Sequence, residues 1–363
     1  MGLCSKVIKL FLFKKDYFTD PKVRWKKINN KIFTKFIREK ILKESKIKNL
    51  KIYKNLGLEK NSNNFKVVCD KKLYLLKSIK IYKKKKIQIL NNINLINWLK
   101  KNKSPVSTQI KLIDGGHGIY LRNENWVLSD FAEGNHFTGN KKEFNDTVKN
   151  ICFTIKLLRK YPYKNNLKIQ NISTSHLYKI FSVMEKNKKR WVKFFGKKQS
   201  SNLNNHWKKI NTIIKDLKLI NYKSKKLEPV HIDIHPHNII TKKNKLISII
   251  DSDSWMLSSV KEAIAYGGFK LCRQVILKNK SQLIKKRIGK NYINKVNKYY
   301  GSSFRLDNNF LLVCEKVILE RLVNIFKLNL FNKNRKWNNF LPILLGHLDE
   351  AKIIFMCDNQ IKK

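Results

Sequence analysis

One short segment, HIDIHPHNIITKKNKLISIIDSDS at residues 231–254, combines histidine, aspartate and asparagine side chains in a chain that is otherwise dominated by lysine. Imidazole and carboxylate groups so close together fit two kinds of chemistry. One is a histidine-rich metal site, and the other is a loop for phosphoryl transfer. The spacing of these side chains distinguishes between them.

The histidine-rich metal site would use His231, His235 and His237, which fall at i, i+4 and i+6. Two histidines four residues apart bind zinc when they share one face of a helix, typically with a glutamate between them. Here Pro236 restricts the backbone of His235 away from the helical region, and no glutamate intervenes. The pattern therefore disfavours zinc, which stays open as an alternative.

Phosphoryl transfer requires a carboxylate that orients the attacking hydroxyl, and oxygen ligands that hold Mg²⁺ against the nucleotide phosphates. Asp233 and Asn238 are five residues apart in one predicted loop. A predicted β-hairpin, which turns around Lys243–Asn244, returns the chain to Asp251. A hard divalent cation prefers these oxygen ligands to imidazole. The histidines are then predicted to brace the loop through their ring nitrogens.

The same segment resembles the H-G-D-x-H-x-x-N … I-D-[FW]-[DE] region of the aminoglycoside phosphotransferase and choline kinase superfamily. The resemblance implies ATP and Mg²⁺ as cofactors and Asp233 as the catalytic base. It implies Asn238 and Asp251 as the magnesium ligands. Ile232 departs from the family pattern, which has glycine there. We predict supporting roles for His231, His235 and Asp253.

The resemblance extends upstream, to segments that bind the nucleotide in this family. KNSNNFKVVCDKKLYLLKSIK is similar to a family segment in which a turn covers the phosphates and a strand lysine follows. WVLSDFAEG resembles the hinge beside the adenine and places Ser129 to Glu133 there. Lys80 competes for the role of the strand lysine. The implied nucleotide-binding residues are Ser62, Asn63, Lys77 and Glu133.

One departure from the family concerns the helix that follows this strand. Related kinases pair the strand lysine with a glutamate on that helix, but the helix predicted at about 86–100 contains no acidic residue. Its polar side chains near the lysine are Gln88, Asn91 and Asn92. This departure leaves open a kinase-fold binding protein without catalytic activity.

The elements that must position these residues fall into two groups. FKVVCDKKLYLLKSIK predicts a hairpin that turns at CDKK, and a second hairpin turns at Arg122–Asn125. Apolar residues at helical spacing predict a helix between them, ended by Pro105. Further helices are predicted after residue 140, two of them within 173–222, and from Val260 to the end. With the resemblance, this order implies an α+β, two-lobed protein-kinase-like fold.

Three domains are predicted. Residues 1–50 form a basic N-terminal extension that is helical from Val23 onward, and residues 51–134 form a small β-rich N-lobe that binds the nucleotide. Residues 135–363 form a larger helical C-lobe with the catalytic loop and the acceptor site.

The composition limits the class of protein and its partners. Hydrophobic residues make up 42% of the chain, too many for a disordered protein. The net charge of +54 suggests an acidic partner, but the lysines are dispersed and form no stripe with aromatic residues, which disfavours nucleic acid. Scattered cysteines without a C-x-x-C pair fit a cytoplasmic location. Peripheral contact with an anionic membrane or glycan stays open.

The sequence therefore predicts an ATP-dependent phosphotransferase whose partners are a nucleotide and a small-molecule hydroxyl acceptor, such as a sugar, amino-sugar or amino-alcohol. Two alternatives stay open. One is the inactive kinase-fold binding protein, and the other is a binder of anionic surfaces or nucleic acid that uses the +54 charge.

Overall fold

A computed structural model describes most of the chain as two compact units, each built from separate segments. One, the sheet unit, lies within residues 17–168 and 235–256, and the other, the helical unit, includes 169–234 and the chain after 256. The domain boundaries predicted at residues 50 and 134 stay predictions. The residues described are 25–42, 49–55, 64–80, 86–110, 119–121, 124–170, 173–220, 226–279, 282–301, 304–305, 307–330 and 337–355.

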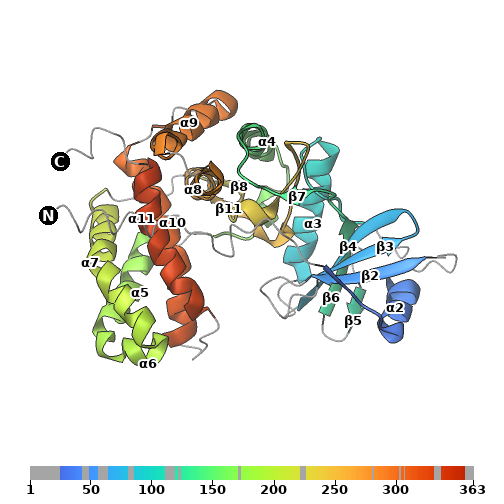
Figure 1. Cartoon of the computed structure of the whole chain (residues 1–363), viewed down its shortest axis with the longest axis horizontal. Coiled ribbons are helices and arrows are strands. Elements are labelled where there is room, and N and C mark those ends of the chain that lie inside the picture. The colour runs from blue at the N-terminus through green and yellow to red at the C-terminus, as the bar shows by residue number, and fades with distance from the viewer. Residues whose placement is uncertain are drawn as a thin grey trace. The chain divides into compact units, whose positions relative to one another are not determined.

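An antiparallel sheet of six strands dominates the described part of the sheet unit, in the order β1-β2-β3-β4-β6-β5 (Figure 1). Both predicted hairpins are confirmed: β3 turns into β4 at Asp70–Lys71, and β5 pairs with β6. The strands are β1 (Trp25–Lys27), β2 (Leu50–Asn55), β3 (Asn64–Cys69), β4 (Lys72–Lys80), β5 (Ile119–Leu121) and β6 (Glu124–Asp130).

The two faces of this sheet have different neighbours. Leu76 is fully buried and packs in a core with Ile37 and Ile41, which belong to the helical segment of α2 (Lys31–Phe36) and a π-helix (Ile37–Leu42). Successive strand side chains point to opposite faces. Lys77 therefore lies on the face of the sheet opposite to this helical segment.

The N-terminal prediction needs one correction. The chain was predicted to be helical from Val23 onward, but Trp25–Lys27 forms strand β1, which pairs with β2, and the helix starts only at Lys31. A strand of three residues is too short to show a period of two, and its backbone hydrogen bonds to β2 are a tertiary effect.

The remaining elements of the sheet unit include the hairpin that lies within residues 231–254. Strand β9 (Ile239–Lys242) turns into β10 (Lys245–Ile249) through Lys243 and Asn244, which have φ values of 51° and 64°. Two consecutive positive φ values are typical of the tight turn that suits strand twist. The other elements are α3 (Lys86–Lys101), β7 (Asn135–His136), which pairs with β9, and α4 (Lys141–Leu158).

Gly134 lies where two segments of this unit approach closely. A Cβ atom on Gly134 would lie 2.4 Å from the backbone oxygen of Thr241 in β9. Only glycine lets the backbone come so near. Because Gly134 immediately precedes β7, this approach fixes the start of β7 against the β9–β10 hairpin.

The helical unit is built around α10, which is buried on nearly all sides and packs against α5, α7, α8 and α11 (Figure 1). Two helices were predicted within 173–222, and the described residues there contain α5, α6 and α7. No helix in the described residues is long and apolar enough to cross a membrane. The helices are α5 (Thr174–Lys186), α6 (Trp191–Phe195), α7 (Lys197–Leu219), α8 (Val260–Asn279), α9 (Gln282–Tyr300), α10 (Asn308–Leu330) and α11 (Leu341–Phe355). Strand β8 (Leu227–His231) pairs with β11 (Trp255–Ser259).

Candidate active site

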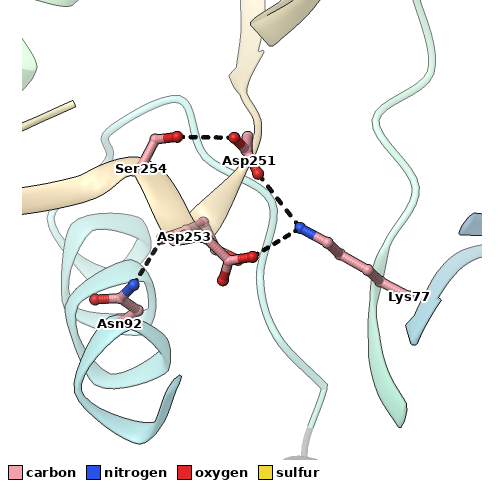
Figure 2. Close-up of polar contacts among 6 residues, drawn as sticks. Lys77, Asn92, Asp251, Asp253 and Ser254 are labelled. Atoms are coloured by element: carbon pink, nitrogen blue, oxygen red, sulfur yellow. Dashed lines mark hydrogen bonds and ion pairs between the residues drawn. The ribbon is translucent and has the colours of Figure 1, made fainter. Parts of the chain in front are cut away.

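Lys77 is bound between two carboxylates. Its Nζ lies 3.3 Å from Oδ1 of Asp251 and 3.0 Å from Oδ2 of Asp253 (Figure 2). The Lys77 side chain is 29% exposed. Burial by itself would lower the pKa of Lys77, but the charges of Asp251 and Asp253 outweigh it and raise this pKa above its usual value. Lys77 therefore carries a fixed positive charge beside two acids.

The turn that carries these acids is held by contacts of its own. Asp251 has a φ of 70°, in the left-handed region that non-glycine residues seldom adopt. Ser254 donates a hydrogen bond to Oδ2 of Asp251 at 2.7 Å, within the short 3-10 helix Ser252–Ser254. Such backbone conformations persist where surrounding contacts enforce them, and they cluster at functional sites. Here the enforced conformation accompanies the contact of Asp251 with Lys77.

Helix α3 reaches this turn through Asn92. The Asn92 side chain, which is 3% exposed, donates a hydrogen bond to the backbone oxygen of Ser252 at 3.0 Å (Figure 2). The acid-free helix that departs from the family pattern thus contacts the acidic turn. The sequence placed Asn92 near the lysine but did not predict this partner.

Asn238 ends a short 3-10 helix, Pro236–Asn238, and is 8% exposed. Its backbone oxygen accepts a hydrogen bond from Ile250 at 2.9 Å, which aligns Asn238 with the residue before Asp251. The hairpin therefore brings the backbones at the two predicted magnesium ligands together. Their oxygen atoms are of the kind that Mg²⁺ prefers.

The histidines of the loop make local contacts. Nδ1 of His235 accepts a hydrogen bond from the backbone N–H of His237 at 3.3 Å, and the His237 ring lies 5.1 Å from the ring of His136. Burial, with the neighbouring His237 and His235, lowers the pKa of His136 to about 4. Among the described residues, no three His, Cys, Asp or Glu side chains are grouped to hold a metal ion.

The sequence did not single out His136. It lies in β7, and only the pairing of β7 with β9 brings it to the loop.

Asp233, the predicted base, lies in the helical unit, in the turn after β8. Its backbone N–H donates to Nδ1 of His231 at 3.3 Å, and the supporting role of His231 stays a prediction. Nη2 of Arg321 in α10 lies 3.2 Å from Oδ1 of Asp233. Sequence reasoning missed Arg321, which lies outside the segment that resembles the family.

Other acidic residues of the helical unit already have cationic partners. Lys316, in α10, forms ion pairs with Glu262, at 2.9 Å, and with Glu320. Burial raises the pKa of Glu320 to about 7, against the opposing charge of Lys316. A cavity of about 20 Å³, roughly the size of one water, lies beside them, and its lining residues are Gln170, Ile232, Ser258, Glu262, Ala263, Val317, Glu320 and Arg321.

Glu133, one of the residues predicted to bind the nucleotide, lies at the surface. Glu133 is 61% exposed on its side chain and lies 3.9 Å from Lys242, a surface ion pair. Ser62 and Asn63 lie outside the described residues, as does the side chain of Lys80. The roles of Ser62, Asn63 and Glu133 stay predictions.

Neither a protein-family model nor a curated protein matches this sequence. Solved structures do match. A spectinomycin phosphotransferase in complex with ADP and spectinomycin superposes with a TM-score of 0.60 at 14% identity, over 90% of this chain and 98% of that chain. An amicoumacin kinase in complex with AMP-PNP and Ca²⁺ gives 0.57 at 12% identity, over 100% and 98%.

An aminoglycoside phosphotransferase from Alicyclobacillus acidocaldarius gives 0.59 at 8% identity, over 86% of this chain and 91% of that chain. This chain has the protein-kinase-like fold. The predicted likeness to the aminoglycoside phosphotransferase superfamily, with a β-rich part and a larger helical part, is confirmed at the level of the fold. A fold hosts many activities, so the reaction must be argued from the side chains.

Proposed function

We propose that this protein is an ATP-dependent phosphotransferase that phosphorylates a hydroxyl group of a small molecule, such as a sugar, amino-sugar or amino-alcohol. The observation that carries the proposal is the position of Lys77 between Asp251 and Asp253. Lys77 and Asp251 are 174 residues apart in the sequence, yet a cation suited to phosphate and a carboxylate suited to a metal ion lie in contact.

The side chains fit the roles that the reaction needs. Asn238 and Asp251 would hold Mg²⁺, which neutralises charge on the phosphate oxygens when it is bound. Lys77 would bind the nucleotide phosphates. Asp233 would orient the acceptor hydroxyl and accept its proton while the new O–P bond forms and ADP leaves with the electron pair of the broken bond.

The contacts of Lys77 favour an enzyme over an inactive binding protein. The ground for inactivity was the absence of an acid on the helix after the strand lysine. Asp253 provides Lys77 with a carboxylate partner from another segment. The similar solved structures also support the proposal, since they include a phosphotransferase in complex with ADP and a kinase in complex with AMP-PNP.

The test measures Mg²⁺-dependent ATP binding by calorimetry and acceptor-stimulated ADP release with a panel of sugars, amino-sugars and amino-alcohols. In Asp233→Asn, we expect kcat to fall by about 10³-fold while ATP still binds. In Asp251→Asn, we expect ATP binding to lose its dependence on Mg²⁺. Normal turnover in Asp233→Asn would show that the base is wrongly assigned. No Mg·ATP binding by the wild type would overturn the proposal.

A further inference from the structure

Arg321 connects helix α10 to the loop of the proposed base. Nη2 of Arg321 donates one hydrogen bond to the backbone oxygen of Ile232 at 2.9 Å and another to Oδ1 of Asp233 at 3.2 Å. The two acceptors belong to consecutive residues. The guanidinium group therefore fixes both the backbone before the base and the carboxylate itself.

The position of this guanidinium group is itself determined by packing. Its carbon lies 5.2 Å from the ring centre of Tyr266 in α8, and the Tyr266 ring is buried. A planar cation stacked on an aromatic ring keeps its orientation better than a flexible ammonium group does. Arg321 thus has an aromatic support on one side and the two oxygens of the Asp233 loop as acceptors.

Among the surrounding carboxylates, Asp233 acts most strongly on the charge of Arg321, ahead of Glu320. The neighbouring acids Glu262 and Glu320 are both ion-paired with Lys316. Asp233 is the carboxylate for which the structure gives an ion pair with Arg321. The Arg321 side chain is 24% exposed, and the Asp233 carboxylate offsets the desolvation of its positive charge, which the neutral oxygen of Ile232 could not do by itself.

We propose that Arg321 is a positioning residue for the phosphotransfer reaction. It holds the Asp233 carboxylate in the orientation in which this carboxylate can take the proton from the hydroxyl group of the acceptor molecule. This inference rests on the proposed function, because it takes Asp233 as the base. Arg321 takes no proton in the reaction. Its positive charge favours the ionised form of the base. Its hydrogen bond to Ile232 holds the loop backbone, and its hydrogen bond to Oδ1 of Asp233 restricts the rotation of the carboxylate.

The test compares Arg321→Met and Arg321→Lys with the wild type, and uses Lys327→Met as the matched control. Lys327 lies in the same helix and outside the proposed site. Circular dichroism establishes that each variant is folded. The measured quantities are kcat, the KM for ATP, the Kd for Mg·ATP and the pH dependence of kcat/KM for the acceptor.

In Arg321→Met, we expect kcat to fall by about 100-fold, because the base is misplaced, while the KM for ATP stays within about two-fold. A base is active when deprotonated, so loss of the nearby cation moves the acid limb of the profile to higher pH, by about one unit. Arg321→Lys restores part of kcat, since it returns the charge without the planar group. Lys327→Met matches the wild type.

Three results would overturn the inference. The first is wild-type kcat and an unmoved acid limb in folded Arg321→Met. The second is an equal loss of kcat and ATP affinity without a shift of the acid limb, which would indicate a structural role alone. The third applies if Arg321→Met does not fold: it is full kcat in Arg321→Lys, which keeps the charge but lacks the planar group. No turnover in the wild type and in Lys327→Met would instead refute the proposed function, on which the inference depends.

Discussion

Lys77 Nζ lies 3.0 Å from Oδ2 of Asp253, which stands 176 residues later in the sequence and outside helix α3. Helix α3 has no acidic residue, so Asp253 supplies a negative charge beside the lysine that the helix does not. Asp251, the proposed metal ligand, contacts the same Nζ at 3.3 Å. When a metal ion takes Asp251, Asp253 is therefore the carboxylate expected to keep Lys77 in place.

This relationship predicts the effect of Asp253→Asn. The variant leaves Asp251 as the main counter-ion of Lys77, and the lysine then competes with the metal ion for that carboxylate. We expect the Kd of Mg·ATP to rise by about ten-fold, equivalent to roughly 1.4 kcal/mol. Calorimetry at fixed Mg²⁺ measures it. Asp130→Asn, an exposed acid in β6 of the same sheet, is the control, and equal affinities in the two variants would contradict the prediction.

Asn92→Ala tests the link between α3 and the acidic turn. The substitution removes the side-chain amide that donates to the partly buried Ser252 carbonyl, so we expect a loss of about 1–3 kcal/mol in the free energy of unfolding. Urea denaturation measures this loss. Asn91→Ala removes the neighbouring amide, which donates to Asn166 at an exposed site, and we expect a smaller effect there. The reverse order would show that the Asn92 contact contributes little.

The half-buried ring of His136 predicts a dependence of stability on pH. Its pKa in the folded protein, about 4, is below the usual value of 6.5, so the unfolded chain binds more protons between these values. Its contribution to stability is complete above pH 6.5 and is lost as the pH falls toward 4. His136→Phe keeps a ring but cannot titrate. We expect the wild type to lose stability relative to this variant by about 1.4 kcal/mol per pH unit in that window. A constant difference between the two unfolding free energies would refute this.

The ion pairs of the helical unit predict which acceptors are preferred. Asp233 is paired with Arg321, and Glu262 and Glu320 are paired with Lys316. Carboxylates that are already neutralised attract a cationic acceptor weakly, and nearby cations repel it. We expect kcat/KM for a neutral sugar to exceed that for the matching amino-sugar by about ten-fold at low salt. A preference for the amino-sugar that weakens with added salt would show an acidic pocket instead.

Local patterns in the sequence predicted a large part of this structure. The hairpin around Lys243–Asn244 was predicted because asparagine and flanking apolar runs are turn and strand signals, and both residues have positive φ. The helix at Lys86–Lys101 followed from apolar spacing of 3.6 residues. The loop from Asp233 to Asn238 followed from residue types at fixed spacing. Each of these predictions depends on residues that are close in the sequence.

The partners of the reactive side chains were decided only by the tertiary structure. Lys77 was predicted to bind phosphate, but its contacts with Asp251 and Asp253 depend on how strand β4 meets a turn more than 170 residues away. The contact of Arg321 with Asp233 likewise depends on the packing of α10, 88 residues from the loop. Periodicity shows which side of an element is buried but not which element covers it. For this reason the sequence indicated the chemistry of the site, and folding determined which charges hold it in place.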